Sequence, residues 1–381
     1  MVSFISKVAK HIEVQRLLQK GQKIGRHIVV FESDDWGSIR MPSVQARTRL
    51  LNKGVVLQSP LSYDLYDTLA SEDDLSDLAE VLDSVRDSDD NPAVLTLDTV
   101  VANPDFERIK ESGFSEYYYE PFSVTLGRYP HHEKSFALWK EGMSKGVFHP
   151  QFHAREHLNA QLWLQCLRNH DPSALAAFDE GVFSMRCMVD NKLQRVLETY
   201  NARADADYPF MLNAIKEGLD LFERLFGFRS ESMIAPCYTW DSPIEEEAAC
   251  NGVLYLQGSV FQSHSYYYSI GHPHQDARYM GTRNSNGQIS LVRNCSFEPS
   301  QSRKHGKDRC LRDISLQFSN GLPAIVSCHR VNFIGDLVPE NRHNNLRQFR
   351  ELLHTIVRRW PDVKFVSSDQ LGRILSEYEA Q

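Results

Sequence analysis

One segment decides the fold: His27-Ile28-Val29-Val30-Phe31-Glu32-Ser33-Asp34-Asp35-Trp36-Gly37, an apolar run that ends in two adjacent carboxylates and a glycine. A short β-branched run followed by acidic residues is typical of a strand that delivers carboxylates to the end of a sheet. Adjacent carboxylates repel each other, so a cation or a solvated cleft between their charges would favour the pair. A solvated turn explains the same residues, and the motif needs its context before it indicates a site.

The bulk composition excludes several classes of protein. With 381 residues, 41% hydrophobic and 24% charged, the chain is typical of a soluble globular protein with one large α/β domain or two ordinary ones. Its formal net charge of -8 argues against nucleic acid as the main partner, because phosphate binding needs a basic face. The seven cysteines are scattered, without any Cys-x-x-Cys pair, which argues against a disulfide framework or a thiolate zinc site and suits a reducing compartment.

Targeting signals are also missing from the sequence as it stands. The segment Met1–Lys7 has no apolar h-region, and no later stretch approaches about 18 consecutive apolar residues. We therefore expect a cytoplasmic protein that does not insert into a membrane, and the oligomeric state stays open.

Strand-like and helix-like segments alternate along the chain. The expected strands are 27–32, 93–97, 147–149, 232–235, 253–256, 323–329 and 363–366. The expected helices are 6–22, 43–53, 72–87, 134–145, the segment from the His153 motif to about 169, 208–225, 242–250 and 343–358. This alternation predicts an α/β fold with a parallel sheet, open or closed into a barrel, in a single domain that spans 1–381.

Four groups of polar residues follow predicted strands, and active sites of parallel α/β folds lie at the carboxyl ends of strands. The groups are the Asp34-Asp35 pair, the His153-Ala154-Arg155-Glu156-His157 motif, the Pro236–Tyr238 loop and His329. This coincidence predicts one functional site at that end of the sheet.

The two histidines of the second group are four residues apart, so on a helical turn both side chains would point the same way. Together with Asp35 they form a 2-His-1-Asp set that suits one divalent metal, Zn first and Co, Ni or Mn as alternatives. Two such histidines also occur by chance on solvated faces. With a metal in place, Asp34 is the expected base towards water and His329 the expected acid towards the leaving group.

In this order, the Asp pair, the His-x-x-x-His motif, the Pro236 loop and the strand-final His329 resemble the polysaccharide deacetylase family, the NodB-like carbohydrate esterases. The resemblance runs from about 27 to 372 and is to a divergent branch of the glycoside hydrolase/deacetylase superfamily. It implies an irregular β/α barrel with parallel strands, outer helices and insertions at about 40–91, 160–206 and 259–310. It also implies hydrolysis of an N- or O-acetyl group on a carbohydrate, with Asp34 as base, His329 as acid, and Asp35, His153 and His157 as metal ligands.

The chain departs from the family pattern at several positions. Ile234 stands where the family has an arginine that orients the base, so Arg155 or Arg293 is expected to provide that charge. The tyrosine that should follow Pro236 comes one place late, at Tyr238, so the amide that stabilises the oxyanion belongs to Cys237 or Tyr238. Ser327 replaces a usual leucine in the last motif. The fourth motif has no match beyond the candidate Arg293-Asn294 with Glu298.

Four further residues are candidates for substrate binding. Trp36 and Trp240 flank two motifs and could stack on a sugar ring, although packing explains them equally well. Arg293 and Arg330 are the candidate polar contacts, and Arg330 could instead fix the loop after His329.

Other functions remain open at this level. The letters H-x-x-E-H at 153–157 also match the inverzincin metallopeptidases, with Glu156 as base and a downstream carboxylate such as Glu231 as third ligand. A glycoside hydrolase would need two carboxylates about 5–10 Å apart across the bond. Because of Ile234 and Ser327, an inactive carbohydrate- or metal-binding protein is a further alternative.

Overall fold

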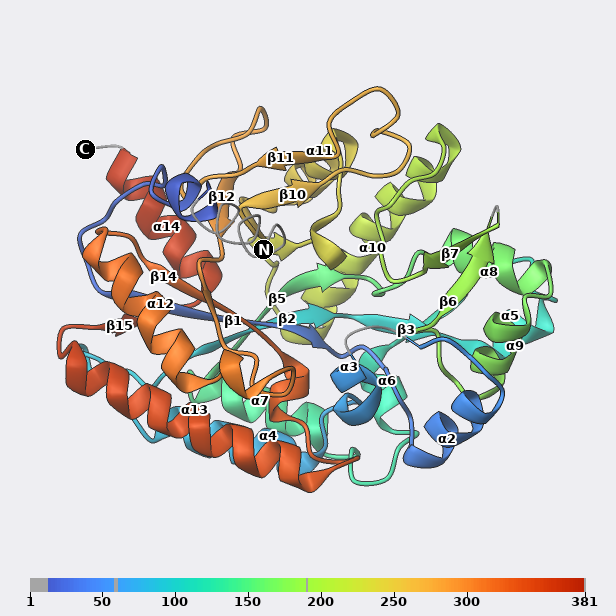
Figure 1. Cartoon of the computed structure of the whole chain (residues 1–381), viewed down its shortest axis with the longest axis horizontal. Helices are drawn as coiled ribbons and strands as arrows, with labels where there is room; N and C mark the ends of the chain where they lie inside the picture. The colour runs from blue at the N-terminus through green and yellow to red at the C-terminus, as the bar shows by residue number, and fades with distance from the viewer. Residues whose placement is uncertain (1–12, 58–60, 190, 380–381) are drawn as a thin grey trace, which may run out of the picture.

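A nine-stranded sheet forms the centre of the computed structural model, which describes residues 13–57, 61–189 and 191–379 (Figure 1). All neighbouring strands in this sheet are parallel. Their order is β12 (Ile289–Val292), β9 (Tyr255–Gly258), β8 (Ser232–Ile234), β5 (Phe148–Ala154), β2 (Leu95–Val100), β1 (Ile28–Trp36), β14 (Ala324–His329) and β13 (Cys295–Ser296), with β15 (Lys364–Phe365) beside β1. The predicted α/β class with a parallel sheet is confirmed.

The two ends of this sheet meet at one short connection. β12 and β13 lie at opposite ends of the strand order, yet only Arg293 and Asn294 separate them in sequence. The amide of Arg293 donates to Gly258 O on one side (2.8 Å), and that of Asn294 donates to Ile325 O on the other (3.1 Å). The sheet therefore curls into the irregular β/α barrel that the sequence predicted.

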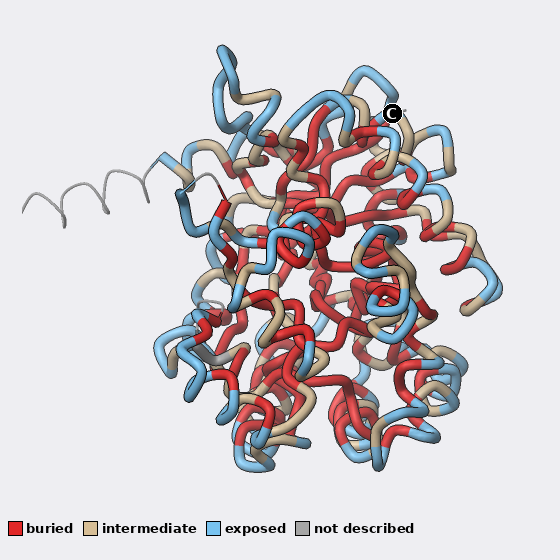
Figure 2. The backbone as a smooth tube through the Cα atoms, turned by 90° about the vertical axis from the view of Figure 1, so that its right-hand side faces the viewer, coloured by how far each residue is buried: buried red, intermediate tan, exposed pale blue. Residues whose placement is uncertain are grey.

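Helices cover the outside of the sheet, and the buried backbone lies between them (Figures 1 and 2). These helices pack on the sheet through apolar stripes. In α13 the stripe consists of buried residues that recur at helical spacing, namely Leu346, Phe349, Leu353 and Ile356. Phe349 meets Phe31 of β1 edge-on at a ring distance of 5.1 Å. These helices are α4 (Glu72–Asp83), α7 (Ser135–Ser144), α10 (Tyr208–Phe226), α11 (Ser242–Cys250), α12 (Lys307–Ser319), α13 (Pro339–Arg359) and α14 (Ser368–Glu379).

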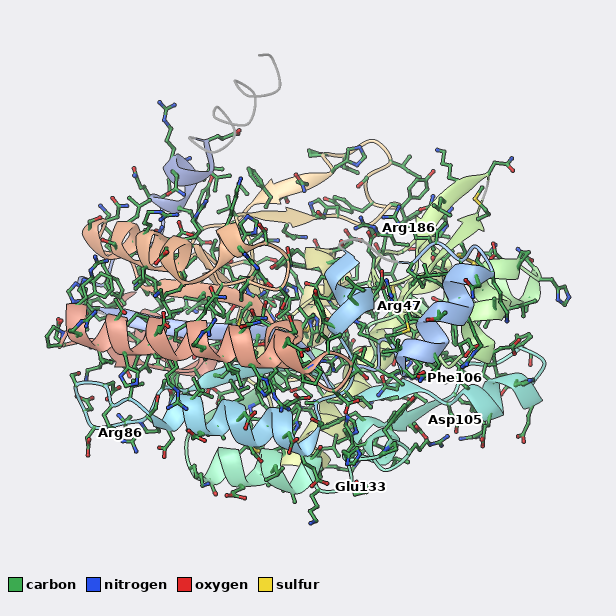
Figure 3. All side chains as sticks on the ribbon, turned by 60° about the horizontal axis from the view of Figure 1, so that its bottom comes forward. Arg47, Arg86, Asp105, Phe106, Glu133 and Arg186 are labelled. Atoms are coloured by element: carbon green, nitrogen blue, oxygen red, sulfur yellow. A yellow bond between two sulfur atoms is a disulfide. The ribbon has the colours of Figure 1, made fainter. Side chains whose placement is uncertain are left out.

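Shorter elements surround the carboxyl ends of the strands. They are α2 (Val44–Asn52), α3 (Leu61–Tyr66), α5 (Phe106–Glu111), α6 (Phe122–Leu126), α8 (Ala160–Arg168) and α9 (Pro172–Asp179), with the two-stranded pairs β3 (Ala102–Pro104) and β4 (Tyr119–Pro121), β6 (Arg186–Val189) and β7 (Lys192–Arg195), and β10 (Phe261–Ser263) and β11 (Gln275–Ala277). The amide of Arg186 donates to Val56 O at 3.1 Å, which ties the β6–β7 hairpin to the segment after α2. Arg47 of α2 and Arg186 accordingly lie on one side of the molecule (Figure 3).

Several sequence predictions need correction. The expected helix from the His153 motif to 169 is wrong at its start, because β5 continues to Ala154 and α8 begins only at Ala160. The segment 259–310 is not only an insertion, since it contributes β12 and β13 to the main sheet. α9, α12 and α14 were not expected. The expected helix 6–22 lies partly outside the described residues, and its described part is helical at 13–18.

The cysteines also differ from expectation. Cys166 of α8 and Cys187 of β6 form a disulfide, with their Cα atoms 6.5 Å apart. The pairing was missed because the two cysteines are 21 residues apart and only the fold brings them together. Within the described ranges, no helix is both long enough and apolar enough to cross a membrane.

Gly37 is the tightest position in the loop that follows β1. Its φ is +82°, and a Cβ there would lie 2.2 Å from Val100 O, so only glycine fits. The side chain of Asn103 holds the same loop by donating to Gly37 O (2.9 Å) and accepting from the amide of Ile39 (2.8 Å).

We predict that Gly37→Ala lowers the free energy of unfolding by about 1–3 kcal/mol more than Gly25→Ala, because only the first adds a clash to the backbone strain. Gly25 is the matched control, since its φ is +61° and nothing lies within 4 Å of the added Cβ. Urea denaturation of both variants measures the difference. Equal losses of unfolding free energy would contradict the close contact between Gly37 and Val100.

Candidate active site

A cavity of about 140 Å³ opens at the carboxyl ends of β1, β5, β8 and β14. The predicted residues Asp34, Asp35, His153, His157, Tyr238 and His329 all line it, together with Arg40, Tyr63, Arg195, Leu197, Ile234, Ala235 and Cys237. The polar groups that the sequence placed at four strand ends therefore meet in one cavity.

Both adjacent carboxylates face this cavity because β1 is irregular at its end. In a regular strand, neighbouring side chains point to opposite faces of the sheet. Here the pairing of β1 with β2 shifts register between Ser33 and Trp36, and Asp35 has a φ of +74°. This bulge turns Asp35 to the same side as Asp34, a distortion that is common beside active sites.

His153 and His157 reach the cavity from the end of β5 and the turn after it, not from a helix. The β2–β5 register shifts so that Phe152 opposes Thr99 and Ala154 opposes Val100, which leaves His153 as the extra residue of a bulge. The two imidazole rings nevertheless lie 5.1 Å apart. The i, i+4 spacing correctly predicted that the two rings lie close together. They do so because of a strand bulge and the turn after it, not because of a helix.

Asp35, His153 and His157 present three ligand atoms to one point. Oδ1 of Asp35 lies 3.4 Å from Nε2 of His157 and 3.7 Å from Nε2 of His153, and all three residues are buried. These separations match ligands that each lie about 2.0–2.2 Å from a shared metal. They are the one group of at least three potential ligands that the described part of the chain contains.

The protonation states of these residues also suit a metal. Nδ1 of His153 lies 2.8 Å from Ile234 O, and a carbonyl only accepts, so Nδ1 is the donor in this contact and Nε2 is the nitrogen available to a metal. That Nε2 is buried and has no hydrogen-bond partner among the described residues. Burial lowers the pKa of His157 to about 3, helped by the charge of Arg40, so its imidazole is neutral. The three residues therefore fit a divalent cation.

Asp35 has a second neighbour that the sequence analysis missed. Nη2 of Arg40 lies 2.9 Å from Oδ1 of Asp35, and both side chains are buried. Burial alone would raise the pKa of Asp35, but the charge of Arg40 outweighs it and holds that pKa well below its usual value. Asp35 is therefore ionised.

Arg293 holds the predicted base. Its Nη1 and Nη2 donate to Oδ2 and Oδ1 of Asp34 at 2.7 and 2.6 Å. Burial would raise the pKa of Asp34, but the charge and hydrogen bonds of Arg293 outweigh it, and the pKa is lowered to about 2. Of the two arginines proposed to orient the base, Arg293 takes this place, while Arg155 is paired with Glu156 and Glu217.

The same guanidinium contacts two more buried carboxyl groups. Nε of Arg293 donates to Glu32 (2.6 Å), and Nη2 donates to Asp98 (3.0 Å). Burial raises the pKa of both carboxyl groups, and the negative charge of Asp34 raises that of Asp98 further. One guanidinium therefore contacts three carboxyl groups. Of these three, Asp34 is the one that lines the cavity, and its pKa is lowered.

His329 is held in the form that an acid needs. Its Nδ1 lies 2.5 Å from Oε1 of Glu298, whose other oxygen accepts from Asn332 at 2.8 Å. Burial alone would lower the pKa of His329, but the charge and hydrogen bond of Glu298 outweigh it, and the pKa is raised to about 9. Its Nε2 lies 3.6 Å from Asp34 Oδ2, so the predicted acid and base face each other.

The loop after β8 lines the cavity with two residues, Cys237 and Tyr238. Cys237 and Tyr238 both have positive φ, 58° and 56°. The amide of Tyr238 donates to Ala235 O at 3.0 Å, whereas the amide of Cys237 has no acceptor among the described residues. Of the two oxyanion candidates, the geometry favours Cys237, and the Tyr238 hydroxyl instead accepts from Arg293 at 3.1 Å.

The proposed substrate contacts are buried side chains. Trp36 is 0% exposed and meets Trp139 edge-on at 5.7 Å, and Trp240 is 4% exposed with its Nε1 donating to Glu245. Arg330 is 0% exposed and donates to Asp67 at 3.0 Å. These three side chains are buried against protein partners, and Arg293 is engaged by carboxyl groups, so substrate binding by the four residues stays a prediction.

The metallopeptidase alternative also fails on geometry. Glu156 is 1% exposed and accepts two hydrogen bonds from Arg155, at 2.6 and 2.9 Å, outside the cavity lining. Glu231 instead accepts from Arg373 of α14 at 2.8 Å. Neither residue can serve the histidine pair.

Sequence reasoning left out Glu32 and Asp98, together with the cavity residues Arg40, Tyr63, Arg195 and Leu197. Glu32 and Asp98 could have been found from the sequence, because a carboxylate inside an apolar strand is buried and therefore needs a buried cation as its partner. Arg40 and Arg195 lie in a loop and at a hairpin end without a recognisable motif, so only the fold reveals them.

Comparison with solved structures agrees with the fold. A protein from Parabacteroides distasonis, provisionally described as a glycoside hydrolase/deacetylase, is 10% identical with a TM-score of 0.50 and covers 94% of this chain and 72% of its own. Proteins provisionally described as polysaccharide deacetylases come from Mycobacterium smegmatis (12% identity, TM-score 0.44, 93% and 92% covered) and Pseudomonas aeruginosa (9%, 0.45, 92% and 91%). The first likeness shows the barrel that the motif order implied. No family model and no curated protein matches the sequence.

We predict that Arg293→Gln lowers the free energy of unfolding at pH 7 by about 3–5 kcal/mol, because it leaves buried carboxyl groups without their cation. The folded pKa of Asp34, about 2, lies below its ordinary 3.8, so this stability is present above pH 3.8 and lost as the pH falls towards 2. The difference between variant and wild type should therefore shrink below pH 3.8. Urea denaturation over this range tests it, with Arg373→Gln as an exposed control expected to lose at most about 1 kcal/mol.

A second prediction concerns the acid. In the metal-free protein, Glu298→Gln should lower the pKa of His329 from about 9 towards or below 6.5, because the buried imidazolium loses its nearest negative charge. NMR titration of the imidazole Cε1 proton measures it, and Glu116→Gln, at an exposed site, is the control. An unchanged titration would refute the assigned pairing.

Proposed function

We propose that this protein is a metal-dependent hydrolase that removes an acetyl group, N- or O-linked, from a carbohydrate. One observation carries the proposal: a complete ligand set, a carboxylate held ionised and an imidazole held protonated line the same small cavity. The barrel of the Parabacteroides protein, provisionally described as a glycoside hydrolase/deacetylase, is consistent with it.

Asp35, His153 and His157 would hold a divalent cation, with Zn the best match to an imidazole and carboxylate set and Co, Ni or Mn also suited. Such a cation, when bound, polarises the acyl carbonyl and lowers the pKa of water to about 7.

The side chains of the chain then move the protons. Asp34, kept ionised and oriented by Arg293, accepts a proton from the attacking water. His329, kept protonated by Glu298, donates the proton on Nε2 to the leaving nitrogen or oxygen. The amide of Cys237, a residue that lines the cavity, would donate to the oxyanion that forms between these steps.

The cavity also suits a small apolar acyl group. Ile234 and Leu197 line it, and Ile234 is the residue that replaces the arginine of the family pattern. Ser327, in place of the usual leucine, lies 3.3 Å from Nη1 of Arg293 and so belongs to the network that holds the base. The two sequence departures that argued for inactivity are therefore compatible with acetyl binding, since Arg293 and Leu197 offer the missing charge and apolar surface.

Metal content and acetate release test the proposal together. We expect close to one equivalent of metal in the wild type, and none in Asp35→Ala or His157→Ala, by elemental analysis. Asp34→Asn should keep the metal yet release acetate from acetylated chitooligosaccharides or acetylated xylan about 10²–10⁴ times more slowly, the usual contribution of a general base.

The matched control is His149→Gln, since His149 lies on the same strand but pairs with Asp369 at 3.0 Å. This variant should bind metal and release acetate as the wild type does. Metal that remains in Asp35→Ala would reject the ligand set, and metal bound as proposed without acetate release would reject the deacetylase activity.

A further inference from the structure

Two arginines line the cavity without a role in the proposed reaction. Arg40 follows β1 and lies beside the metal ligands, and Arg195 ends β7 on the hairpin that borders the same cavity. Both lie close enough to Cys237 for their charges to act on its side chain. Two positive groups from distant parts of the chain therefore converge on one site.

Arg40 is only partly satisfied by its protein partners. It is 6% exposed, and its Nη2 contacts Asp35 at 2.9 Å. Its Nε is buried and makes no hydrogen bond with the described residues. The nearest carboxylate oxygen, Oδ2 of Asp67, lies 3.7 Å away in an ion pair, while Nε of Arg330 donates to the other oxygen of that carboxylate. A fixed positive charge against a metal ligand opposes cation binding. The charge of Arg40 is instead available to attract an anionic ligand towards the cavity.

Arg195 is free to take such a ligand. Its side chain is exposed at the cavity mouth, and no carboxylate in the described ranges lies within 4.0 Å of it. Guanidinium groups favour carboxylates and phosphates, which they bind through two parallel hydrogen bonds. Arg195 thus offers an unused anion contact.

The charges of the cavity point the same way. The lining carboxylates are Asp34 and Asp35. The lining cations are Arg40, Arg195 and the protonated His329, so positive charge already exceeds negative charge and a bound divalent cation would add to this excess. The chain as a whole carries a formal charge of -8, so this positive cavity is a local feature. A cleft of one sign raises the local concentration and association rate of oppositely charged ligands, and a neutral sugar gains nothing from it.

We propose that the substrate is an acetylated sugar that carries an acidic group, a carboxylate or a phosphate, and that Arg195 selects it with support from Arg40. The inference rests on the proposed deacetylase function. The cavity of about 140 Å³ is smaller than the ~300 Å³ or more of pockets that enclose whole ligands, so the acetyl end enters while the acidic group stays near the mouth, where Arg195 lies.

Matched pairs of substrates test the proposal. The first pair is O-acetylated oligogalacturonate and its carboxyl-reduced form, and the second is N-acetylglucosamine 1-phosphate and N-acetylglucosamine. The metal-loaded wild type should show a kcat/KM about 10–100 times higher for the acidic member of at least one pair, as expected for one charge-assisted hydrogen bond. Arg195→Gln should remove that preference by lowering kcat/KM for the acidic member. The pair that responds identifies the acidic group.

Lys192→Gln is the control, because Lys192 is an exposed cation on the same hairpin that does not line the cavity. It should keep the preference. Equal rates for both members of each pair, unaffected by Arg195→Gln, would overturn the inference while the deacetylase function stands.

Calorimetric binding to the metal-loaded Asp34→Asn variant separates the two claims. This variant lacks the proposed base and should bind the acidic member about 10–100 times more tightly, a difference that the added Arg195→Gln change abolishes. If the wild type releases no acetate but this binding difference persists, the proposed function fails and the anion site stands. Equal binding of both members, with or without Arg195, would overturn the anion site.

Discussion

The contact of Arg293 with Asp34, Glu32 and Asp98 is the interaction on which the rest of the structure depends. Arg293 stands at the connection between β12 and β13, where the two ends of the sheet meet. The residue that closes the barrel thus also binds the proposed base. Arg293 is buried and forms ion pairs with Glu32 and Asp34 of β1 and with Asp98 of β2. These three contacts hold the ends of β1 and β2 in place relative to the connection between β12 and β13.

Around this contact, backbone irregularities aim the functional groups. The bulges at Asp35 and His153 and the positive φ of Cys237 and Tyr238 each occur where a regular strand or turn would direct the side chain or amide elsewhere. Such conformations cost about 1–3 kcal/mol each and persist only where the surrounding packing holds them. The neighbouring strands are fully buried on both faces, which supplies that packing.

Much of the site could be predicted from the sequence, because parallel strands bring their carboxyl ends to one side. Asp34, Asp35, His153, His157 and His329 needed only strand periodicity and motif order. The rest depends on contacts that no local pattern encodes: Arg293 and Asp34 are 259 residues apart. The short strands β12 and β13 lie in a polar stretch that resembles a loop. For Trp36 the sequence left sugar stacking and core packing equally open, and only the fold shows that this side chain is buried.

The central claim, that Asp35, His153 and His157 hold one divalent metal beside Asp34, is tested most directly by anomalous diffraction from crystals grown with zinc. We expect a single strong peak about 2.0–2.3 Å from Oδ1 of Asp35 and from Nε2 of both histidines. A peak located instead at exposed residues such as His272 and His274, with no anomalous signal in the cavity, would contradict it.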